Sequence, residues 1–399
     1  MPALLKHRLL SVRGVSLAFA LALLLSLGVG AASAAQPQLT VVARGLSNPR
    51  KIFLAPDGAV YVVEAGNGGR SECLGKGANE TCLGTTASIL RIEHGKSAEV
   101  VTGLVSFASP NAEEAEGPSD VLVRGNSYDI LFQDADINSK GVNPAGPIAA
   151  TAGDLISTPA GKVAPRVIAN FAAFEAAHNP DHGAGPGAKF GDPSIDSDPY
   201  AFTPYRGGYA VADAAGNDLL WVNPKGKISV LAVFPTQTEK LTKAIDKTLG
   251  VPTTLTSILV QSVPTCVAVG PDGALYVGEL TGAPFEPGTA RIWRVTPGQT
   301  KPALYASGFT NISDLAFDGQ KLLVLEIAER GLLDQTSSGA LIRLTPGKQR
   351  RVLLTSGLVA PTGLAIGHGL IYISNYGIFP GTGKGPHGEL DTLPASIAS

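Results

Sequence analysis

Three short apolar runs lie between residues 209 and 235, and a turn sequence follows each of the first two. The runs are YAVA, DLLWV and ISVLAV, with GN at 216–217 and NPKG at 223–226 between them. Apolar runs of this length between Gly, Pro and Asn predict antiparallel strands joined by tight loops. Residues 199–203 add a fourth run, so the stretch predicts a four-stranded meander. One meander cannot bury its own apolar faces, and copies are therefore expected elsewhere in the chain.

Five further units repeat this pattern. The six units start near residues 48, 117, 198, 263, 311 and 360. The spacings from 263 to 311 and from 311 to 360 are 48 and 49 residues, and the longer spacings indicate loop insertions in the same unit. A repeat of four strands and roughly 40 to 50 residues is typical of a β-propeller blade. The high content of Gly and Pro, 48 and 29 residues, agrees with such a turn-rich chain.

The sixth unit lacks one strand, and the N-terminal region supplies a candidate for it. Residues 38–46 belong to no unit of their own, yet they match the pattern of RVLLTSGL at 351–358, the fourth strand of the fifth unit. If this strand completes the last blade, the ring closes and removes the exposed edges that an open row of sheets would leave. We predict an all-β, six-bladed β-propeller that forms a single domain over residues 36–399.

Residues 1–35 have the three parts of a signal peptide. Basic residues come first, an apolar run follows at 15–29, and small residues occupy 31–35. An uncleaved anchor is the alternative, but the run is shorter than the ~20 residues that span a bilayer. We therefore predict a secreted or periplasmic protein with no membrane span after cleavage. The net charge is −2, and the sequence has no basic stripe of the kind that binds nucleic acid. Nucleic acid is therefore excluded as a partner.

Export places the three cysteines of the chain in an oxidising compartment. Cys73 and Cys82 flank one loop rich in Gly and Asn, which predicts a disulfide between them. Cys266 lies in the apolar run CVAV, which predicts a buried thiol instead of a nucleophile.

The long insertions fall in two classes of connection, from the second to the third strand of a blade and from one blade to the next. In a propeller both classes lie on the same side, here called the long-loop face. Loops on a rigid scaffold are where function concentrates, so this face is the predicted functional surface. Two insertions predict helices. One covers residues 170–178, and the other is a lid at 236–249, where Thr236 and Glu239 match a capping box.

The second strand of each blade ends on a polar residue, at the long-loop side. These residues are Glu64, Asp213, Glu279, Glu326 and Asn375, with Gln133 or Asp134 in the irregular second blade. If the strands lie close to the axis, the residues ring the mouth of the central channel, where their oxygens could bind Ca²⁺ or another divalent cation. The alternative is that each side chain bonds the backbone of the following turn and closes its own loop.

His182 and Asn217 are further candidates for ligand binding on the long-loop face. His178 and His182 are four residues apart, but Pro and Gly in HNPDHGAG argue against the helix that a shared metal would require. The unit at 209–235 has the shortest connection between its second and third strands, so Asp213 and Asn217 are expected to have the least cover. Asn217 and His182 are the predicted binding residues.

Several stretches of the chain resemble one family. They are VADAAGNDLLWVNPKGKISVLAVFP, GLSNPRKIFLAPDGAVYVVEAG, VPTCVAVGPDGALYVGELTGAPFEPGTARIWRV and APTGLAIGHGLIYISNYG. Together with the residues between them, they resemble the ScyD/ScyE family over nearly all of the chain after the signal segment. Members of this family are exported bacterial proteins associated with the biosynthesis of the sunscreen pigment scytonemin. They are similar to NHL-type and gluconolactonase-type six-bladed propellers.

The resemblance implies the fold and the compartment, but it carries over no reaction. The lactonase-type propellers imply a metal held by acidic and amide side chains at the channel mouth. The positions that match this role are the strand ends Glu64, Asp213, Glu279, Glu326 and Asn375.

Two functions remain in view. The first is an exported binding or scaffold protein whose long-loop face engages a small molecule, a glycan or a protein. The second is a lactonase-like hydrolase that depends on a divalent metal held by the acidic strand ends. The chain contains no Gly-x-Ser-x-Gly, His-Glu-x-x-His or phosphate-loop motif, which favours the first function.

Overall fold

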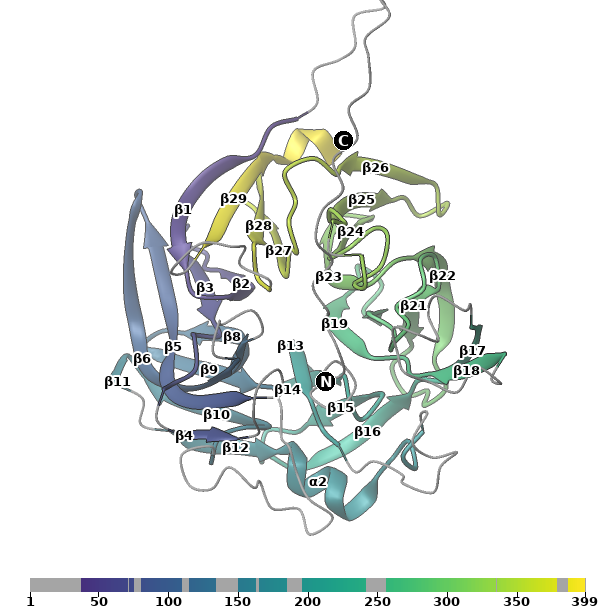
Figure 1. Cartoon of the computed structure of the whole chain (residues 1–399), viewed down its shortest axis with the longest axis horizontal. Helices are drawn as coiled ribbons and strands as arrows, with labels where there is room; N and C mark the ends of the chain where they lie inside the picture. Colours follow the sequence, from purple (N-terminus) through teal and green to yellow (C-terminus); the bar gives the residue numbers. More distant parts are fainter. Residues whose placement is uncertain are drawn as a thin grey trace, which may run out of the picture.

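Turn residues separate the apolar runs of each repeat, and every repeat folds into an antiparallel sheet. Six sheets stand around a central axis as the blades of a propeller (Figure 1). The computed structural model describes residues 37–70, 72–74, 80–109, 115–133, 150–162, 165–184, 196–241, 256–334, 336–378 and 387–398. The predicted all-β, six-bladed propeller is confirmed.

The first strand of each blade lies nearest the axis and contacts the first strands of both neighbouring blades. In blade order, these strands are β2 (Pro49–Leu54), β8 (Pro118–Arg124), β13 (Pro199–Tyr205), β19 (Pro264–Val269), β23 (Ile312–Asp318) and β27 (Gly363–Gly367). All six begin within a few residues of the starts that the repeat pattern predicts.

The other strands of each blade follow outward in chain order. The second strands are β3 (Val60–Glu64), β9 (Ser127–Phe132), β14 (Gly208–Asp213), β20 (Leu275–Glu279), β24 (Lys321–Glu326) and β28 (Leu370–Asn375). The third strands are β5 (Thr81–Glu93), β10 (Asp154–Pro159), β15 (Asp218–Val222), β21 (Ala290–Val295), β25 (Ala340–Leu344) and β29 (Gly388–Pro394). The fourth strands are β6 (Lys96–Ala108), β12 (Arg166–Asn170), β16 (Ile228–Val233), β22 (Ala303–Phe309), β26 (Arg350–Leu354) and β1 (Thr40–Leu46).

The N-terminal strand closes the ring. β1 pairs antiparallel with β29, so that Thr40 lies opposite Thr392 and Leu46 lies opposite Gly388. The sixth blade therefore takes three strands from the C-terminal end of the chain and one from the N-terminal end (Figure 1). The predicted closure is confirmed.

The hydrophobic core is divided among the spaces between blades. Each pair of neighbouring blades shares one apolar cluster, for example Phe234 of blade 3 against Trp293 of blade 4, whose ring centroids are 6.1 Å apart. Second strands such as β14 are therefore buried on both faces. This burial explains why their sequences are continuous apolar runs, without the alternation of a half-exposed strand. Each large buried side chain contributes about 1.5–3 kcal/mol.

Polar side chains of the first strands meet near the axis. Lys51 Nζ lies 2.9 Å from Asp314 Oδ1, and both side chains are buried. Arg50 donates to the backbone carbonyls of Gly377 and Ala115, which lie on the connections of blades 6 and 1. These two cations of β2 therefore tie blade 1 to blade 6 and, across the ring, to blade 5.

Secondary structure outside the blades confirms one predicted helix and corrects the other. α2 (Phe171–His178) begins where expected, with the Asn170 side chain accepting a hydrogen bond from Ala173 N at 2.6 Å. The start of the predicted lid helix is wrong, because β17 (Gln237–Lys240) pairs with β18 (Ser257–Val260) there. Pairing with a distant strand overrode the local capping signal at this point. The rest of that prediction, residues 242–249, lies outside the described residues.

The remaining elements are short. β4 (Glu72–Leu74), β7 (Ala115–Glu116) and β11 (Gly161–Lys162) extend the first sheet, and the 3₁₀ helix η4 (Ala395–Ala398) follows β29. The predicted signal peptide lies outside the described residues. Within the part of the chain that the structure describes, no helix has the length and apolar character needed to span a membrane.

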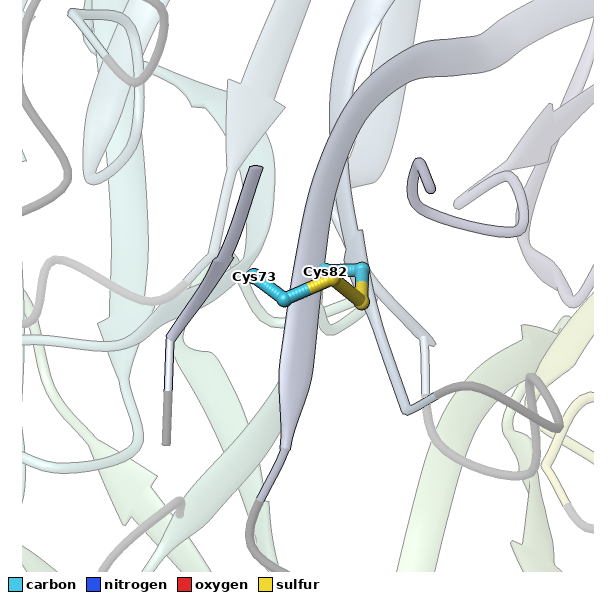
Figure 2. Close-up of a disulfide and its surroundings, with 2 residues drawn as sticks. All are labelled: Cys73 and Cys82. Carbon is cyan, nitrogen blue, oxygen red and sulfur yellow. A yellow bond between two sulfur atoms is a disulfide. The ribbon is translucent and has the colours of Figure 1, made fainter. Parts of the chain in front are cut away.

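Cys73 and Cys82 form the predicted disulfide, which joins β4 to β5 (Figure 2). The two residues are direct cross-strand partners, with Cα atoms 4.0 Å apart. β4 pairs only with β5, so the disulfide holds a local hairpin at the edge of the first blade.

Replacing both cysteines by serine is expected to loosen this hairpin alone. A closed loop of this length stabilises by about 2–3 kcal/mol, which corresponds to roughly 30- to 150-fold faster amide exchange in β4. Hydrogen exchange with peptide-level resolution would measure the effect, with β28 as an internal reference that should keep its rate. Unchanged exchange in β4 would show that strand pairing alone holds the hairpin.

Candidate functional site

The long connections begin and end on one side of the ring. They join second to third strands and one blade to the next, and their described parts include residues 65–70, 150–153, 171–184 and 256–263. Turns such as 206–207 and 319–320 join strands on the other side, here called the short-turn face. The asymmetry predicted from the sequence is therefore present.

The five predicted strand-end residues, here called the strand-end ring, occupy the same place in their blades. Each side chain accepts a hydrogen bond from the segment that enters its own blade, 15 to 17 residues earlier in the chain. The donors are the backbone N–H groups of Ser47, Asp198, Thr310 and Val359, to Glu64, Asp213, Glu326 and Asn375 in that order, and the Ser262 hydroxyl to Glu279. The ring thus fastens the entry of each blade to its second strand.

These contacts are similar to the predicted alternative, in which each side chain bonds the backbone of the turn that follows it, with one difference. The bonds go to the segment before the blade, and only Asp213 also accepts from the turn that follows it, through Gly216 N at 3.0 Å. Burial raises the pKa of Asp213 and of Glu326 to about 7, although these same hydrogen bonds oppose the shift. Burial likewise raises the pKa of Glu64 and of Glu279.

The strand-end ring does not converge on one point. Among the described residues, the one group of three or more His, Cys, Asp or Glu side chains with ligand atoms all within 4.8 Å of one another is Cys73, Glu80 and Cys82. The two sulfurs of that group are already joined in the disulfide. Gln133, in the second blade, is buried at the equivalent strand end, and Asp134 lies outside the described residues.

An apolar cluster lies among the connections of the long-loop face. Ala214, Leu280 and Ile327 follow the strand-end residues of blades 3, 4 and 5 directly, and they pack with Val263 and Phe285. The ring carboxylates are 0–6% exposed. The long-loop end of the ring therefore combines apolar packing between connections with buried carboxylates.

The structure places the two predicted binding residues differently. His182 is exposed, with its backbone in the left-handed region at φ 58°. Asn217 is fully buried and joins three segments: its Nδ2 donates to Asp181 Oδ2 at 2.8 Å, and its Oδ1 accepts from Val263 N at 3.1 Å. The expectation that Asp213 and Asn217 have little cover is wrong, because the connection after α2 and the segment entering blade 4 pack over this short turn.

A cluster of four carboxylates, here called the α2 acidic cluster, lies at this position. It consists of Glu175 of α2, Asp181 after it, and Asp213 and Asp218 on adjacent strands of blade 3. Burial, reinforced by Asp213 and Asp181, raises the pKa of Glu175 to about 8. Burial, reinforced by Asp213, Glu175 and Asp181, raises the pKa of Asp218 well above its usual range. Counting across the tight turn from Asp213 would have placed Asp218 opposite it, but nothing local in the sequence brings Glu175 there.

Cys266 is fully buried near the axis, as predicted. Burial raises the pKa of its thiol to about 12, despite the opposing charge of Lys51. A neutral, enclosed thiol is a packing group, because the thiolate is the nucleophilic form.

A hollow of about 370 Å³ lies on the opposite side of the molecule, between blades 2 and 3. Arg124, Arg166 and Lys225 are among its lining residues, together with the turns at 207–208 and 223–226. This hollow gives the short-turn face a cationic surface.

No protein-family model matches the chain, and no curated protein matches its sequence. Among solved structures, the PQQ-bound aldose sugar dehydrogenase of Streptomyces coelicolor is similar, with a TM-score of 0.50, 14% identity, and coverage of 91% of this chain and 99% of that one. Regucalcin, a calcium-binding protein of Agrobacterium tumefaciens, gives a TM-score of 0.47 at 10% identity and covers 90% of this chain and 94% of its own. Similarity at such low identity shows the propeller fold and nothing about activity.

Proposed function

We propose that this chain is an exported binding protein of the ScyD/ScyE type, which engages its partner through the long-loop face. The observation that carries the proposal is the use of the strand-end ring. Each ring side chain is bonded within its own blade, which suits a rigid scaffold that presents loops. The N-terminal sequence and the Cys73–Cys82 disulfide support an exported protein.

The competing function is a metal-dependent hydrolase that uses the same ring. Glu279 bears on it most directly, because its carboxylate accepts from Arg291 Nε at 2.7 Å and from Trp293 Nε1 at 2.6 Å. A carboxylate already held by a guanidinium and an indole has little to offer a cation. We therefore interpret Glu279 as a residue that stabilises blade 4.

A lactonase assay separates the two functions. We expect no turnover of sugar lactones above the uncatalysed rate with Ca²⁺, Mn²⁺ or Zn²⁺, and we expect Glu279→Gln and Glu326→Gln to change the melting temperature only. Metal-dependent turnover that either substitution abolishes at unchanged stability would establish the hydrolase instead.

Blocking each face in turn tests where a partner binds. Leu333, 40% exposed on the connection between β24 and β25, and Lys225, exposed in the turn between β15 and β16, can each be changed to Cys and coupled to polyethylene glycol maleimide. Cys266 is fully buried and should stay unlabelled. With insoluble peptidoglycan and β-glucan as probes, we expect the block at Leu333 to weaken co-sedimentation at least tenfold and the block at Lys225 to leave it unchanged. Loss only at Lys225, or no binding to any probe, would contradict the proposal.

A further inference from the structure

Asp218 is a fully buried acid, and no described residue of the protein forms a hydrogen bond with its carboxylate. Its side chain is 0% exposed, and within the described part of the chain neither carboxylate oxygen has a hydrogen-bond partner. Burying an ionised carboxyl group without partners costs several kcal/mol, and this cost is usually offset by donors, by protonation or by a bound cation. The surroundings of Asp218 bear on which of these applies.

The groups whose charges act on Asp218 are all acidic. They are Asp213, Glu175 and Asp181. Asp213 is the direct cross-strand partner of Asp218 on β14 and β15, and like charges in such a position destabilise a sheet. Glu175 approaches from α2 and is 2% exposed. Glu175, Asp213 and Asp218 are buried and Asp181 is half-buried, and the charges that act on Asp218 include no Lys or Arg.

Two other blades place a donor on the third strand, opposite the strand-end acid. In blade 1, the Ser88 hydroxyl on the third strand donates to Glu64 at 2.6 Å. In blade 4, Arg291 Nε on the third strand donates to Glu279 at 2.7 Å. Blade 5 has Ala340 at this place, and blade 3 has a second carboxylate, Asp218. Without a donor, a proton or a cation from solution must offset the burial of Asp218.

We propose that Glu175, Asp181, Asp213 and Asp218 form a binding site for a divalent cation, with Ca²⁺ as the favoured ion. The four contribute only carboxylate oxygens, which Ca²⁺ prefers, and both Asp218 oxygens are available. Asp181 Oδ2 accepts one bond, from Asn217, and keeps a lone pair for the ion. No three of these acids have oxygens all within 4.8 Å in the structure, so binding of the ion requires the side chains to move closer together.

The site would fasten the long connection between blades 2 and 3 to the scaffold. Glu175 and Asp181 belong to that connection, and Asp213 and Asp218 belong to blade 3. The ion thus supplies the charge that holds α2 against the ring. This inference goes beyond the proposed binding function and does not depend on which partner the long-loop face takes.

Isothermal titration of the chelator-treated protein with CaCl₂ tests the site, and the melting temperature with and without Ca²⁺ gives a second readout. We expect one Ca²⁺ per chain, a higher melting temperature on binding, and a Kd at least tenfold weaker in Asp218→Asn. The matched control is Glu326→Gln, a buried strand-end acid of blade 5, which should bind as the wild type does.

A second variant, Asp181→Asn, keeps the test valid if Asp218→Asn fails to fold. Asp181→Asn lies on the connection after α2, where the substitution removes a charge and keeps the size of the side chain. We expect it to weaken Ca²⁺ binding as well. Absence of Ca²⁺ binding by the wild type, binding that survives in Asp218→Asn, or binding that Glu326→Gln abolishes would each overturn the proposal, and none of these outcomes decides where a partner binds.

Discussion

Replacing Lys51 with methionine is expected to lower the free energy of unfolding by about 3–5 kcal/mol, the usual cost of leaving one partner of a buried ion pair alone. Lys51 Nζ lies 2.9 Å from Asp314 Oδ1, and the side chains are 5% and 11% exposed. Burial, the largest influence, lowers the pKa of Lys51, but Asp314 together with Cys266 and Tyr200 outweighs burial, and the net direction is upward. For a chain of this size, the loss corresponds to a melting temperature roughly 5 °C lower.

A double-mutant cycle isolates the pair. Leu315 N donates to Asp314 Oδ1 and Leu364 N donates to Asp314 Oδ2. Asp314→Asn keeps an acceptor for one of these two N–H groups through its amide oxygen, and it removes the charge that Lys51 requires. Lys51→Met combined with Asp314→Asn should recover much of the loss, because no buried charge then remains. Arg330→Met, in an exposed pair with Asp334 at 2.8 Å, should change stability by no more than about 0.5 kcal/mol. Strictly additive losses at Lys51 and Asp314 would show that the pair is not coupled.

Raising the pH from about 5 to about 8.5 in the presence of a chelator is expected to destabilise the protein by several kcal/mol. Burial raises the pKa of Glu175 to about 8 and that of Asp120, Asp154, Asp213 and Glu326 to about 7. These values lie above the unfolded values of about 4, so the folded state holds protons that the unfolded state releases. Stability from these groups is complete below about pH 4 and is lost as the pH rises through 7 to 8.

Thermal unfolding between pH 5 and pH 8.5 measures this effect. We expect the melting temperature to fall by about 5–10 °C across this range without divalent cations. Glu175→Gln should flatten the profile, because it removes the group with the highest pKa of the five. Saturating Ca²⁺ should also flatten it if the α2 acidic cluster binds the ion. A melting temperature that is constant or rises from pH 5 to pH 8.5 would contradict the direction of these pKa shifts.

Local sequence patterns were sufficient where neighbouring residues decide the structure. Turn residues between apolar runs predicted the blades, the match of residues 38–46 to a fourth strand predicted the closing strand, and the segment 170–178 was correctly predicted as a helix. The same kind of local signal failed at Thr236 and Glu239, where β17 pairs with a strand that begins at Ser257. A capping box reports on the next few residues only, and it carries no information about such a partner.

The strand-end ring shows the same division. Recurrence at one strand position correctly placed Glu64, Asp213, Glu279, Glu326 and Asn375 at equivalent strand ends on the long-loop side. Their chemical use depends on what faces each of them, and that differs from blade to blade. Arg291 donates a hydrogen bond to Glu279, whereas Asp218 lies directly across the strand pair from Asp213. The repeat determines position, and the neighbours determine charge state and ligand.

The sequence by itself determined the number of blades, the closing strand, the disulfide and the side of the ring that bears the long loops. These features follow from patterns that recur within each repeat or from residues close together in the chain. Only the tertiary structure decided that Lys51 reaches Asp314 across the ring and that Glu175 lies within the electrostatic influence of Asp181, Asp213 and Asp218. Such contacts join residues from different repeats, and their energies depend on burial and on distances between side chains, which no spacing along the chain specifies.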